Sequence, residues 1–597
     1  MNSTRLQYQL SLHCWQQHLF AVTLTVPKHD AQLLTFSLPS WIPGSYMVRD
    51  FAKNIVEIEF CQFETGHKVA FEKCDKQTWL VHSSGDALVV KYIVHANDLS
   101  VRSAFINHQY AFINGTSAFL NVKEMQHLPC ELSIAPPPKA SWKAHTSMSP
   151  INHDNSPEQW QFYSESYAEF IDHPIFIGEC ETYRFDVQGI TFDLLFSGHQ
   201  NIDKARIAED LTPICEHHLQ LFGAPHPISR YLFMTLLADN GFGGLEHRNS
   251  TALLYPRYEL PLVGEDKGHK TDGYITFLSL CSHELFHTWH VKRIKPEVMV
   301  APQLQEETYT NQLWIYEGFT SFYDDVTLAR AGVIDGEKYL DIVAQNLTRL
   351  LQNAGRFKQS AAQSSFDAWT KFYKQDASAT NNIVSYYTKG GIIAFGLDLL
   401  LRKHTDNRVS LDNVMKVLWE RYGRDEIGTP DDVIARICQD HFDIDISEYL
   451  NAVVYGTDDV PLERWLDDIG LALHTRTAVS ADDKGGKTAF AGIRHQFGAN
   501  YKPATLGLTV TQVFEGLSAA QAGVMVNDTL LAINDEIVTA VKLQRLLDNA
   551  TTDTVKITVI RDGQLINLTL AVIEARKDRA FFTIEDNDKF NTWLARA

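Results

Sequence analysis

Several features are missing from this sequence, and each absence excludes a class of protein. No run of about 18 apolar residues occurs, so we expect no membrane-spanning helix. The N-terminal stretch MNSTRLQYQLSLHCWQQHLF has no basic region followed by an apolar one, so we expect no signal peptide. No unit of about 20–50 residues recurs, which excludes a repeat array.

The cysteine pattern and the net charge narrow the possible partners and location. The eight cysteines are scattered and form no Cys-x-x-Cys pair, which in a chain of 597 residues is typical of reduced thiols. We therefore expect a cytoplasmic protein. The formal net charge of −20 is opposite in sign to what nucleic-acid phosphates attract, so we expect no nucleic-acid partner.

The composition changes along the chain and predicts a multidomain α+β fold. Residues 1–170 are rich in Val, Ile, Tyr and Phe, partly alternating and separated by turn residues, and predict an N-terminal β-sandwich. Residues 171–478 open with strand patterns and continue with mostly helical ones, such as GEKYLDIVAQNLTRLLQNAG, which predicts an amphipathic helix. The polar stretch VSADDKGGKT predicts a linker after this domain.

Beyond the linker the chain returns to β character. Residues 489–575 follow the order strand, short helix, strand, helix and hairpin, which resembles a PDZ domain. Leu506-Gly507-Leu508 matches the loop that binds a peptide carboxylate in PDZ domains of bacterial proteases, and Ala522-Gly523-Val524 matches the turn after the short helix. The resemblance implies a C-terminal peptide as a partner of this domain. Residues 576–597 are predicted to be a C-terminal tail.

The stretch CSHELFHTWH has the pattern of a metal site with a catalytic base. His283 and His287 are four residues apart, so both imidazoles project from one face of a helix, where they can bind zinc. Glu284 then lies beside the metal, where a general base can take a proton from water. Two buried neutral histidines bonded to the backbone would give the same pattern. His290, about one turn beyond His287, is interpreted as a structural residue or as one that supports a ligand without binding the metal.

A catalytic zinc site needs a third protein ligand and one open position. The strongest candidate is Glu317, which lies in the aromatic segment QLWIYEGFTSFYDD. A carboxylate buried among Trp314, Tyr316 and Phe319 is costly unless a cation pairs with it. The alternative is an exposed glutamate on a surface helix.

HELFHTW followed by LWIYEGF resembles the zinc peptidases with two histidines and a downstream glutamate, the gluzincins. Among these the chain is similar to the glycyl aminopeptidase family, because PSWIPGSYMVRDFA matches that family's N-terminal β-domain and HELFHTWHVKRIKP its catalytic segment. The resemblance implies a thermolysin-like catalytic domain with one zinc ion, held by His283, His287 and Glu317. It also implies hydrolysis of the N-terminal residue of peptides, with Gly or Ala preferred.

The same resemblance gives a role to GFGGLEHRNS. Gly243-Gly244-Leu245-Glu246-His247 resembles the GxMEN exopeptidase motif, whose glutamate contacts the free α-amino group of the substrate. Glu246 is therefore implied as the amine anchor, because a carboxylate attracts an ammonium ion. Gly244 lets the substrate backbone approach closely, and His247 is implied beside the substrate.

SYYTKGGIIAFGL carries a further motif. Tyr387-Thr-Lys-Gly390 resembles the Tyr-x-Lys-Gly motif of these peptidases, whose tyrosine stabilises the oxyanion of the tetrahedral intermediate. A phenol suits this role, because it donates a hydrogen bond while neutral. Tyr386 is the competing residue, and the spacing to Lys389 and Gly390 favours Tyr387.

Other hypotheses stay open beside the zinc aminopeptidase. One is a zinc endopeptidase targeted by its PDZ domain, which would cleave substrates with a blocked N-terminus. Another is a peptide-binding scaffold with a vestigial site, although Glu284, Glu317 and Tyr387 are all present. Some related zinc enzymes also open epoxides, but no residue here favours that reaction.

Overall fold

The computed structural model of the chain describes residues 4–151 and 160–595, which fall into two compact units. The first unit comprises Met1–Thr308 and Trp419–Thr429, and the second comprises Tyr309–Leu418 and Pro430–Ala597. Strands dominate the beginning of the chain and helices follow, which confirms the predicted multidomain α+β class. In the described part of the chain, every helix is too short or too polar to span a lipid bilayer.

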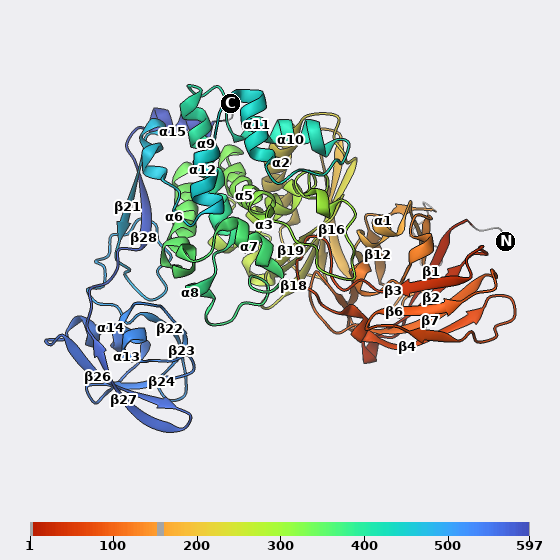
Figure 1. Ribbon diagram of the computed structural model, residues 1–597, viewed down its shortest axis with the longest axis horizontal. Coiled ribbons are helices and arrows are strands. Elements are labelled where there is room, and N and C mark those ends of the chain that lie inside the picture. Colours follow the sequence, from red (N-terminus) through yellow and green to blue (C-terminus); the bar gives the residue numbers. More distant parts are fainter. Residues whose placement is uncertain (1–3, 152–159, 596–597) are drawn as a thin grey trace. The chain divides into compact units, whose positions relative to one another are not determined.

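The first unit begins with a β-rich domain (Figure 1). Its strands are β1 (Leu6–Cys14), β2 (Leu19–Val26), β3 (Leu33–Ser37), β4 (Ile55–Gln62), β5 (Phe71–Lys73), β6 (Thr78–His82), β7 (Leu88–His95), β8 (Ala104–Ile106), β9 (Tyr110–Ile113), β10 (Asn121–Val122), β11 (Cys130–Ile134), β12 (Lys143–Thr146), β13 (Ser149–Pro150), β14 (Gln161–Ser164) and β15 (Ile175–Gly178). They form a seven-stranded sheet, β13-β14-β11-β1-β2-β7-β4, and two four-stranded sheets, β10-β3-β6-β5 and β12-β15-β9-β8.

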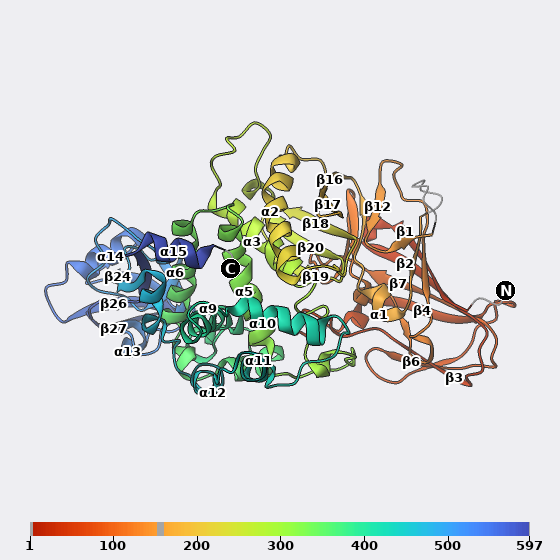
Figure 2. The same cartoon turned by 90° about the horizontal axis from the view of Figure 1, so that it is seen from above.

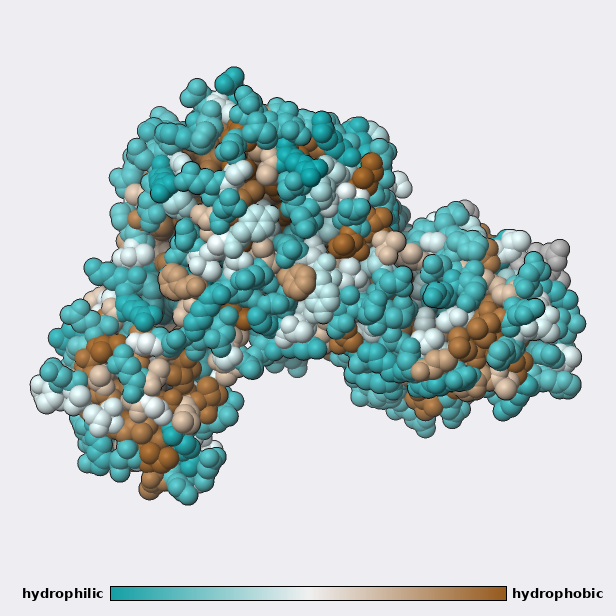
Figure 3. Space-filling view, viewed as in Figure 1, coloured by the Kyte–Doolittle hydropathy of each residue, from teal (hydrophilic) through white to brown (hydrophobic). Residues whose placement is uncertain are grey.

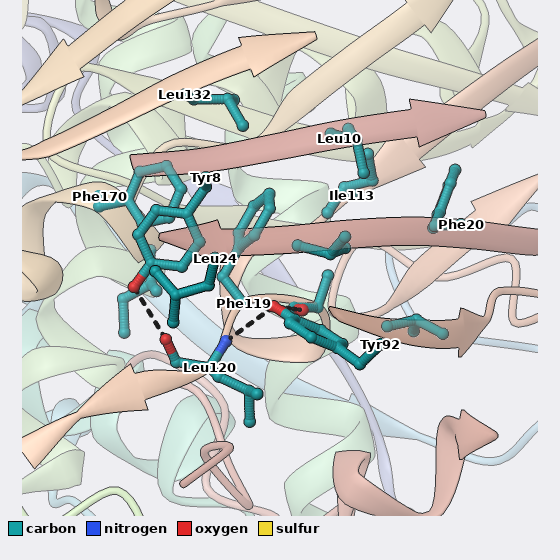
Figure 4. Close-up of a cluster of buried hydrophobic side chains, with 14 of the residues drawn as sticks. Tyr8, Leu10, Phe20, Leu24, Tyr92, Ile113, Phe119, Leu120, Leu132 and Phe170 are labelled. Atoms are coloured by element: carbon teal, nitrogen blue, oxygen red, sulfur yellow. Dashed lines mark hydrogen bonds between the residues drawn. The ribbon is translucent and has the colours of Figure 1, made fainter. Parts of the chain in front are cut away.

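The core of this domain explains why buried and more exposed residues alternate along its strands. Along β2, every second side chain is buried, and the buried residues of the large sheet share one apolar cluster with Leu34 and Phe36 of β3. The buried hydroxyls within the cluster are satisfied (Figure 4). Tyr8 donates to the carbonyl of Leu120 at 2.8 Å, and Tyr92 accepts from the Leu120 amide at 3.2 Å.

The β-rich domain extends past the predicted boundary at residue 170. A short helix, α1 (Tyr167–Ile171), leads into β15, which pairs with β9 and β12 and is buried along its whole length. The predicted boundary fell inside this helix, one residue before its end. The extra strand was missed because four consecutive buried residues give no alternating pattern.

A five-stranded sheet follows in the same unit. It contains β16 (Cys180–Val187), β17 (Ile190–Ser197), β18 (Arg230–Ala238), β19 (Gly243–Glu246) and β20 (Ser250–Pro256), in the order β16-β17-β18-β20-β19. Helices α2 (Lys204–Phe222) and α3 (Asp272–Phe286) pack against each other and against this sheet (Figures 1 and 2). As the last strand in the order, β19 pairs on one side with β20.

The second unit is mainly helical. Its helices before the C-terminal lobe are α4 (Leu313–Tyr316), α5 (Gly318–Arg330), α6 (Gly336–Gln352), α7 (Ala361–Phe366), α8 (Ala379–Asn382), α9 (Tyr386–His404), α10 (Leu411–Leu418), α11 (Val433–Phe442) and α12 (Ser447–Leu450). The predicted amphipathic helix is α6, where Asp335 caps the N-terminus by accepting from the Lys338 amide at 2.8 Å. α5 packs against α9, and Gly318 meets the backbone of Gly390 with no room for a Cβ atom.

The C-terminal lobe of the second unit is a separate sheet with two helices. Its elements are β22 (Ala499–Pro503), β23 (Leu508–Val513), α13 (Ser518–Ala522), β24 (Thr529–Ile533), β25 (Glu536–Ile537), α14 (Ala540–Asp548), β26 (Thr554–Arg561) and β27 (Gln564–Ala571). Their order matches the predicted succession of strands and helices. Large hydrophobic side chains are exposed on this lobe (Figure 3), among them Leu506, Met525, Ile537, Val541 and Leu565.

Residues 576–597 differ from the predicted tail. β28 (Arg579–Ile584) pairs antiparallel with β21 (Leu471–Arg476), and α15 (Asn587–Leu594) follows it. Phe590 and Trp593 of α15 are each 2% exposed, and the Trp593 indole donates to Asp398 at 2.8 Å. The segment is held by this burial, which a short sequence with few apolar residues did not reveal.

Candidate functional site

Helix α3 carries the first group of candidate residues in the first unit. Thr271 caps it by accepting from the Tyr274 amide at 3.1 Å, and Tyr231 donates to the carbonyl of Glu284 at 3.1 Å. The first contact caps the N-terminus of the helix, and the second holds its C-terminal end, on which the HELFH motif lies. His283 and His287 face each other with ring centroids 4.6 Å apart.

His287 ends the helix, and its tautomer is set by the backbone. Its side chain is 1% exposed, and its Nδ1 atom lies 2.7 Å from the carbonyl oxygen of His290. Since a carbonyl only accepts, Nδ1 carries the proton and Nε2 keeps its lone pair for a metal ion. His290 therefore contributes through its backbone, as expected for a residue that is not a ligand.

Glu284 is buried, at 4% exposure, beside Gly244 of β19. A Cβ atom at position 244 would overlap its carboxylate, so any other residue there would displace the Glu284 side chain. Oε2 of Glu284 lies 3.3 Å from the Thr251 hydroxyl. Burial raises the pKa of Glu284 to about 7; the charge of Glu246 adds to the rise, and the imidazole of His283 opposes it.

The raised pKa predicts a pH-dependent stability of the metal-free protein. Between pH 4.5 and about 7 the unfolded chain releases the Glu284 proton and the folded chain keeps it, so stability falls as pH rises. A shift of this size corresponds to about 3 kcal/mol. We expect Glu284→Gln to raise the free energy of unfolding of zinc-free protein by about 3 kcal/mol at pH 8 and by no more than about 1 kcal/mol at pH 5.

Urea unfolding of both proteins after chelation measures this difference. Glu337→Gln on the exposed face of α6 is the control and should give no pH-dependent difference. Equal stabilisation by Glu284→Gln at pH 5 and pH 8 would show that the carboxyl group is not the cause.

The edge strand β19 presents the second carboxylate of the site. Glu246 is 4% exposed, and its Oε1 atom is buried with no hydrogen-bond partner in the described structure. Gly44, in a turn of the N-terminal domain with φ +96°, lies directly against this carboxylate, and a Cβ atom there would overlap it. A buried carboxylate oxygen left without a donor is costly, so the position suits a cationic ligand.

Asp172 of the N-terminal domain contacts the side chain of His247. Its Nδ1 atom lies 3.2 Å from Asp172, and Asp172 also pairs with Lys292 at 2.7 Å. Although burial opposes it, the charges of Lys292 and His247 hold the pKa of Asp172 below its ordinary value. The ring orientation is thus fixed by Asp172, and the contact of His247 with a substrate stays a prediction.

Glu317 and Tyr387 belong to the second unit. Glu317 lies between α4 and α5, is 2% exposed, and is therefore not the surface glutamate of the alternative interpretation. Tyr387 lies in the first turn of α9 and is partly buried, whereas Tyr386 is fully buried. Burial raises the pKa of Tyr387 and the charge of Glu317 adds to the rise, so the phenol keeps its proton at neutral pH.

The structure groups the three predicted ligands. One donor atom from each of His283, His287 and Glu317 lies within 4.8 Å of the others. Two imidazole nitrogens and a carboxylate oxygen form a donor set that zinc accepts, and the buried Glu317 gains a cation to offset its burial.

A second candidate site is a cavity of about 410 Å³ in the second unit. The C-terminal lobe lines it with Phe497, Gly498 and Ala499 at the start of β22 and with Leu543 and Gln544 of α14. Helix α6, residues 478–484 and residues 576–579 line the rest. Leu506-Gly507-Leu508, the predicted carboxylate-binding loop, lies instead at the turn between β22 and β23. Phe497-Gly498-Ala499 has the same apolar-Gly-apolar pattern, and both glycines have positive φ, so the assignment of the carboxylate-binding loop stays a prediction.

Several residues of the site were not identified from the sequence. Arg102 donates through Nη2 to the carbonyl of Gly244 at 2.8 Å, and Gly44, Asp172 and Thr251 contact the motif residues described above. Gly44 lies in PSWIPGSYMVRDFA, the stretch that resembles the N-terminal domain of the family, so the sequence alone could have identified it. Arg102 and Asp172 are isolated polar residues in sequence and carry no such signal.

Comparison with known proteins identifies related sequences and structures. The family model of the Peptidase M61 N-terminal domain matches residues 7–179, and that of the M61 glycyl aminopeptidase matches residues 276–393. The crystal structure of an aminopeptidase N family protein from Idiomarina loihiensis is 38% identical with a TM-score of 0.95, and the match covers 99% of this chain and 100% of that one. No curated protein sequence matches the chain.

More distant matches come from Deinococcus radiodurans. An M1 zinc metallopeptidase is 13% identical with a TM-score of 0.42, covering 74% of this chain and 90% of that one. A mutant of that enzyme bound to a Tyr-Ser-Ala substrate is 13% identical with a TM-score of 0.44, covering 74% and 91%. At such low similarity these two structures carry no residue assignments to this chain.

Proposed function

Because this chain belongs to the M61 glycyl aminopeptidase family of zinc metallopeptidases, we propose that it removes the first residue from peptides with a free N-terminus. The observation that supports this proposal most strongly is a pair of buried carboxylates: Glu284 packs against Gly244, and Glu246 lies two residues further along β19. One suits a base that acts on water, and the other suits an ammonium ion. An endopeptidase has no use for the second.

We assign the metal site to His283, His287 and Glu317, holding one zinc ion. The grouping of their donor atoms and the tautomer of His287 support this assignment. When bound, zinc supplies a Lewis acid that makes water and the substrate carbonyl more reactive. Glu284 lies beside the ligands and takes a proton from the attacking water, then delivers it to the leaving amine.

Tyr387 donates a hydrogen bond to the oxyanion of the tetrahedral intermediate. Its raised pKa supports this role, because a neutral phenol is the donor that an oxyanion needs. We expect Tyr387→Phe to lower kcat about 100- to 1,000-fold with a small change in KM. Tyr386→Phe is the matched control and should leave kcat nearly unchanged. The reverse pattern would transfer the role to Tyr386.

Glu246 anchors the α-amino group of the substrate. We expect Glu246→Gln to raise KM for a Gly-initiated peptide about 10- to 100-fold, because a charge-assisted hydrogen bond is lost. N-acetylated peptides should be poor substrates of the wild type and no worse for the variant. Glu216→Gln, an exposed position on α2, is the control. Unchanged KM in Glu246→Gln would favour the endopeptidase hypothesis.

The family also supports a preference for glycine or alanine as the first residue of the substrate. Kinetics with peptides that differ only in their first residue tests this preference. The eight free cysteines support a cytoplasmic location. Fractionation of the source cells tests the cytoplasmic location.

For the C-terminal lobe we propose a PDZ domain that binds peptide C-termini. The edge strand β22 supports this, because an edge strand beside a helix can accept an extended peptide as an added strand, and both β22 and α14 contribute to the lining of the cavity. The backbone around Gly498 replaces the predicted loop as the carboxylate site. Calorimetric titration with a free-acid peptide and its C-terminal amide tests it, and equal affinity for both would contradict it.

A further inference from the structure

Arg102 reaches the candidate site from the N-terminal domain. Its neighbour Val101 is 1% exposed and belongs to one apolar cluster with Leu245 of β19, which fixes the loop against the five-stranded sheet. Nη2 of Arg102 donates to the Gly244 carbonyl at 2.8 Å, and Nη1 lies 3.4 Å from where a Cβ atom of Gly243 would be. The guanidinium therefore lies at the Gly243 end of β19.

The groups of the site follow an order along this strand. Glu246 lies at one end, Gly244 packs against Glu284 two residues earlier, and Arg102 lies at Gly243 and Gly244. A strand rises about 3.3 Å per residue, so β19 spans about 10 Å from Glu246 to Gly243. An extended dipeptide or tripeptide spans about 7–10 Å, so its two ends can reach both groups.

The chemistry of Arg102 matches the far end of such a substrate. A guanidinium has five N–H donors in a planar fork that fits a carboxylate. One donor of Arg102 holds Gly244, and its Nε atom has no partner in the described structure. Holding one carbonyl needs no permanent positive charge, whereas binding a carboxylate does.

We propose that Arg102 binds the C-terminal carboxylate of dipeptide and tripeptide substrates, so that short peptides with a free C-terminus are preferred. This inference rests on the proposed aminopeptidase function. The amino group at Glu246 and the scissile bond at Glu284 leave Arg102 on the side of the departing product.

The test compares Gly-Ala with Gly-Ala amide on the zinc-loaded full chain. The wild type should cleave the acid at least about 10-fold more efficiently than the amide, through KM. Arg102→Gln should lose this preference and cleave both at the rate of the amide. Arg102→Lys keeps the charge and should retain part of the preference. Arg421→Gln, an exposed arginine of the same unit, should behave as the wild type.

The outcomes separate the two proposals. Equal efficiency for acid and amide in the wild type, or a preference that persists in Arg102→Gln, would overturn the role of Arg102 while leaving the aminopeptidase intact. If Arg102 has a purely structural role, Arg102→Gln and Arg102→Lys should both lower the efficiency of cleavage equally for the acid and the amide. Cleavage of neither dipeptide, nor of longer peptides, by the wild type would overturn the proposed function as well.

Discussion

Replacing Glu284 by glutamine is expected to lower kcat by about 1,000-fold or more while zinc stays bound at one ion per chain. Glutamine has the shape of glutamate but cannot take a proton from water at neutral pH. Glu284 is not among the three grouped ligands, so its replacement leaves the donor set complete. Steady-state kinetics and metal analysis of the same preparation measure both quantities.

The control for this variant is Glu337→Gln, which changes the same group at an exposed position of α6. It should keep full activity. A Glu284→Gln protein that retains activity within about 10-fold of the wild type would exclude Glu284 as the base, since general base catalysis contributes more than that. Loss of zinc would instead place Glu284 among the ligands.

Replacing His287 by alanine is expected to have the second large effect. The variant loses one of three protein ligands, so zinc content at submicromolar free zinc should fall well below one per chain, and kcat should fall about 1,000-fold or more. The buried Glu317 also loses its cation, so the thermal midpoint should fall. Metal analysis, kinetics and a thermal melt measure these changes.

The variant His290→Gln tests whether His290 binds zinc itself or only positions the ligand His287. The contact of His290 with His287 is made by the backbone carbonyl, which the substitution keeps. We therefore expect zinc content near one per chain, even where the buried position costs stability. A His290→Gln protein without zinc, beside a His287→Ala protein with zinc, would reverse the assignment of the two histidines.

The parts of the site that follow from local spacing could be predicted from the sequence. His283, Glu284 and His287 lie within one helical turn, and the predicted third ligand Glu317 proved buried and grouped with the two histidines. A helix fixes the relation of residues i and i+4 by its geometry, so no tertiary information was needed. Glu246 was identified only through the resemblance of its motif.

The remaining contacts depend on tertiary structure. Arg102 meets Gly244 across 142 residues, and Asp172 meets Lys292 across 120 residues. No local pattern encodes such pairs, because each partner is an ordinary polar residue in its own segment. In the C-terminal lobe two stretches shared one pattern, and only the position of α14 decided which of them lines the cavity.

Hydrolysis of a Gly-initiated peptide and its N-acetylated twin, with and without a zinc chelator, tests the central claim most directly. We predict that the free peptide alone is cleaved and that chelation abolishes cleavage until zinc is restored. Equal cleavage of both peptides would contradict the role of Glu246 and favour an endopeptidase. Cleavage that survives complete removal of zinc would contradict the metal site itself.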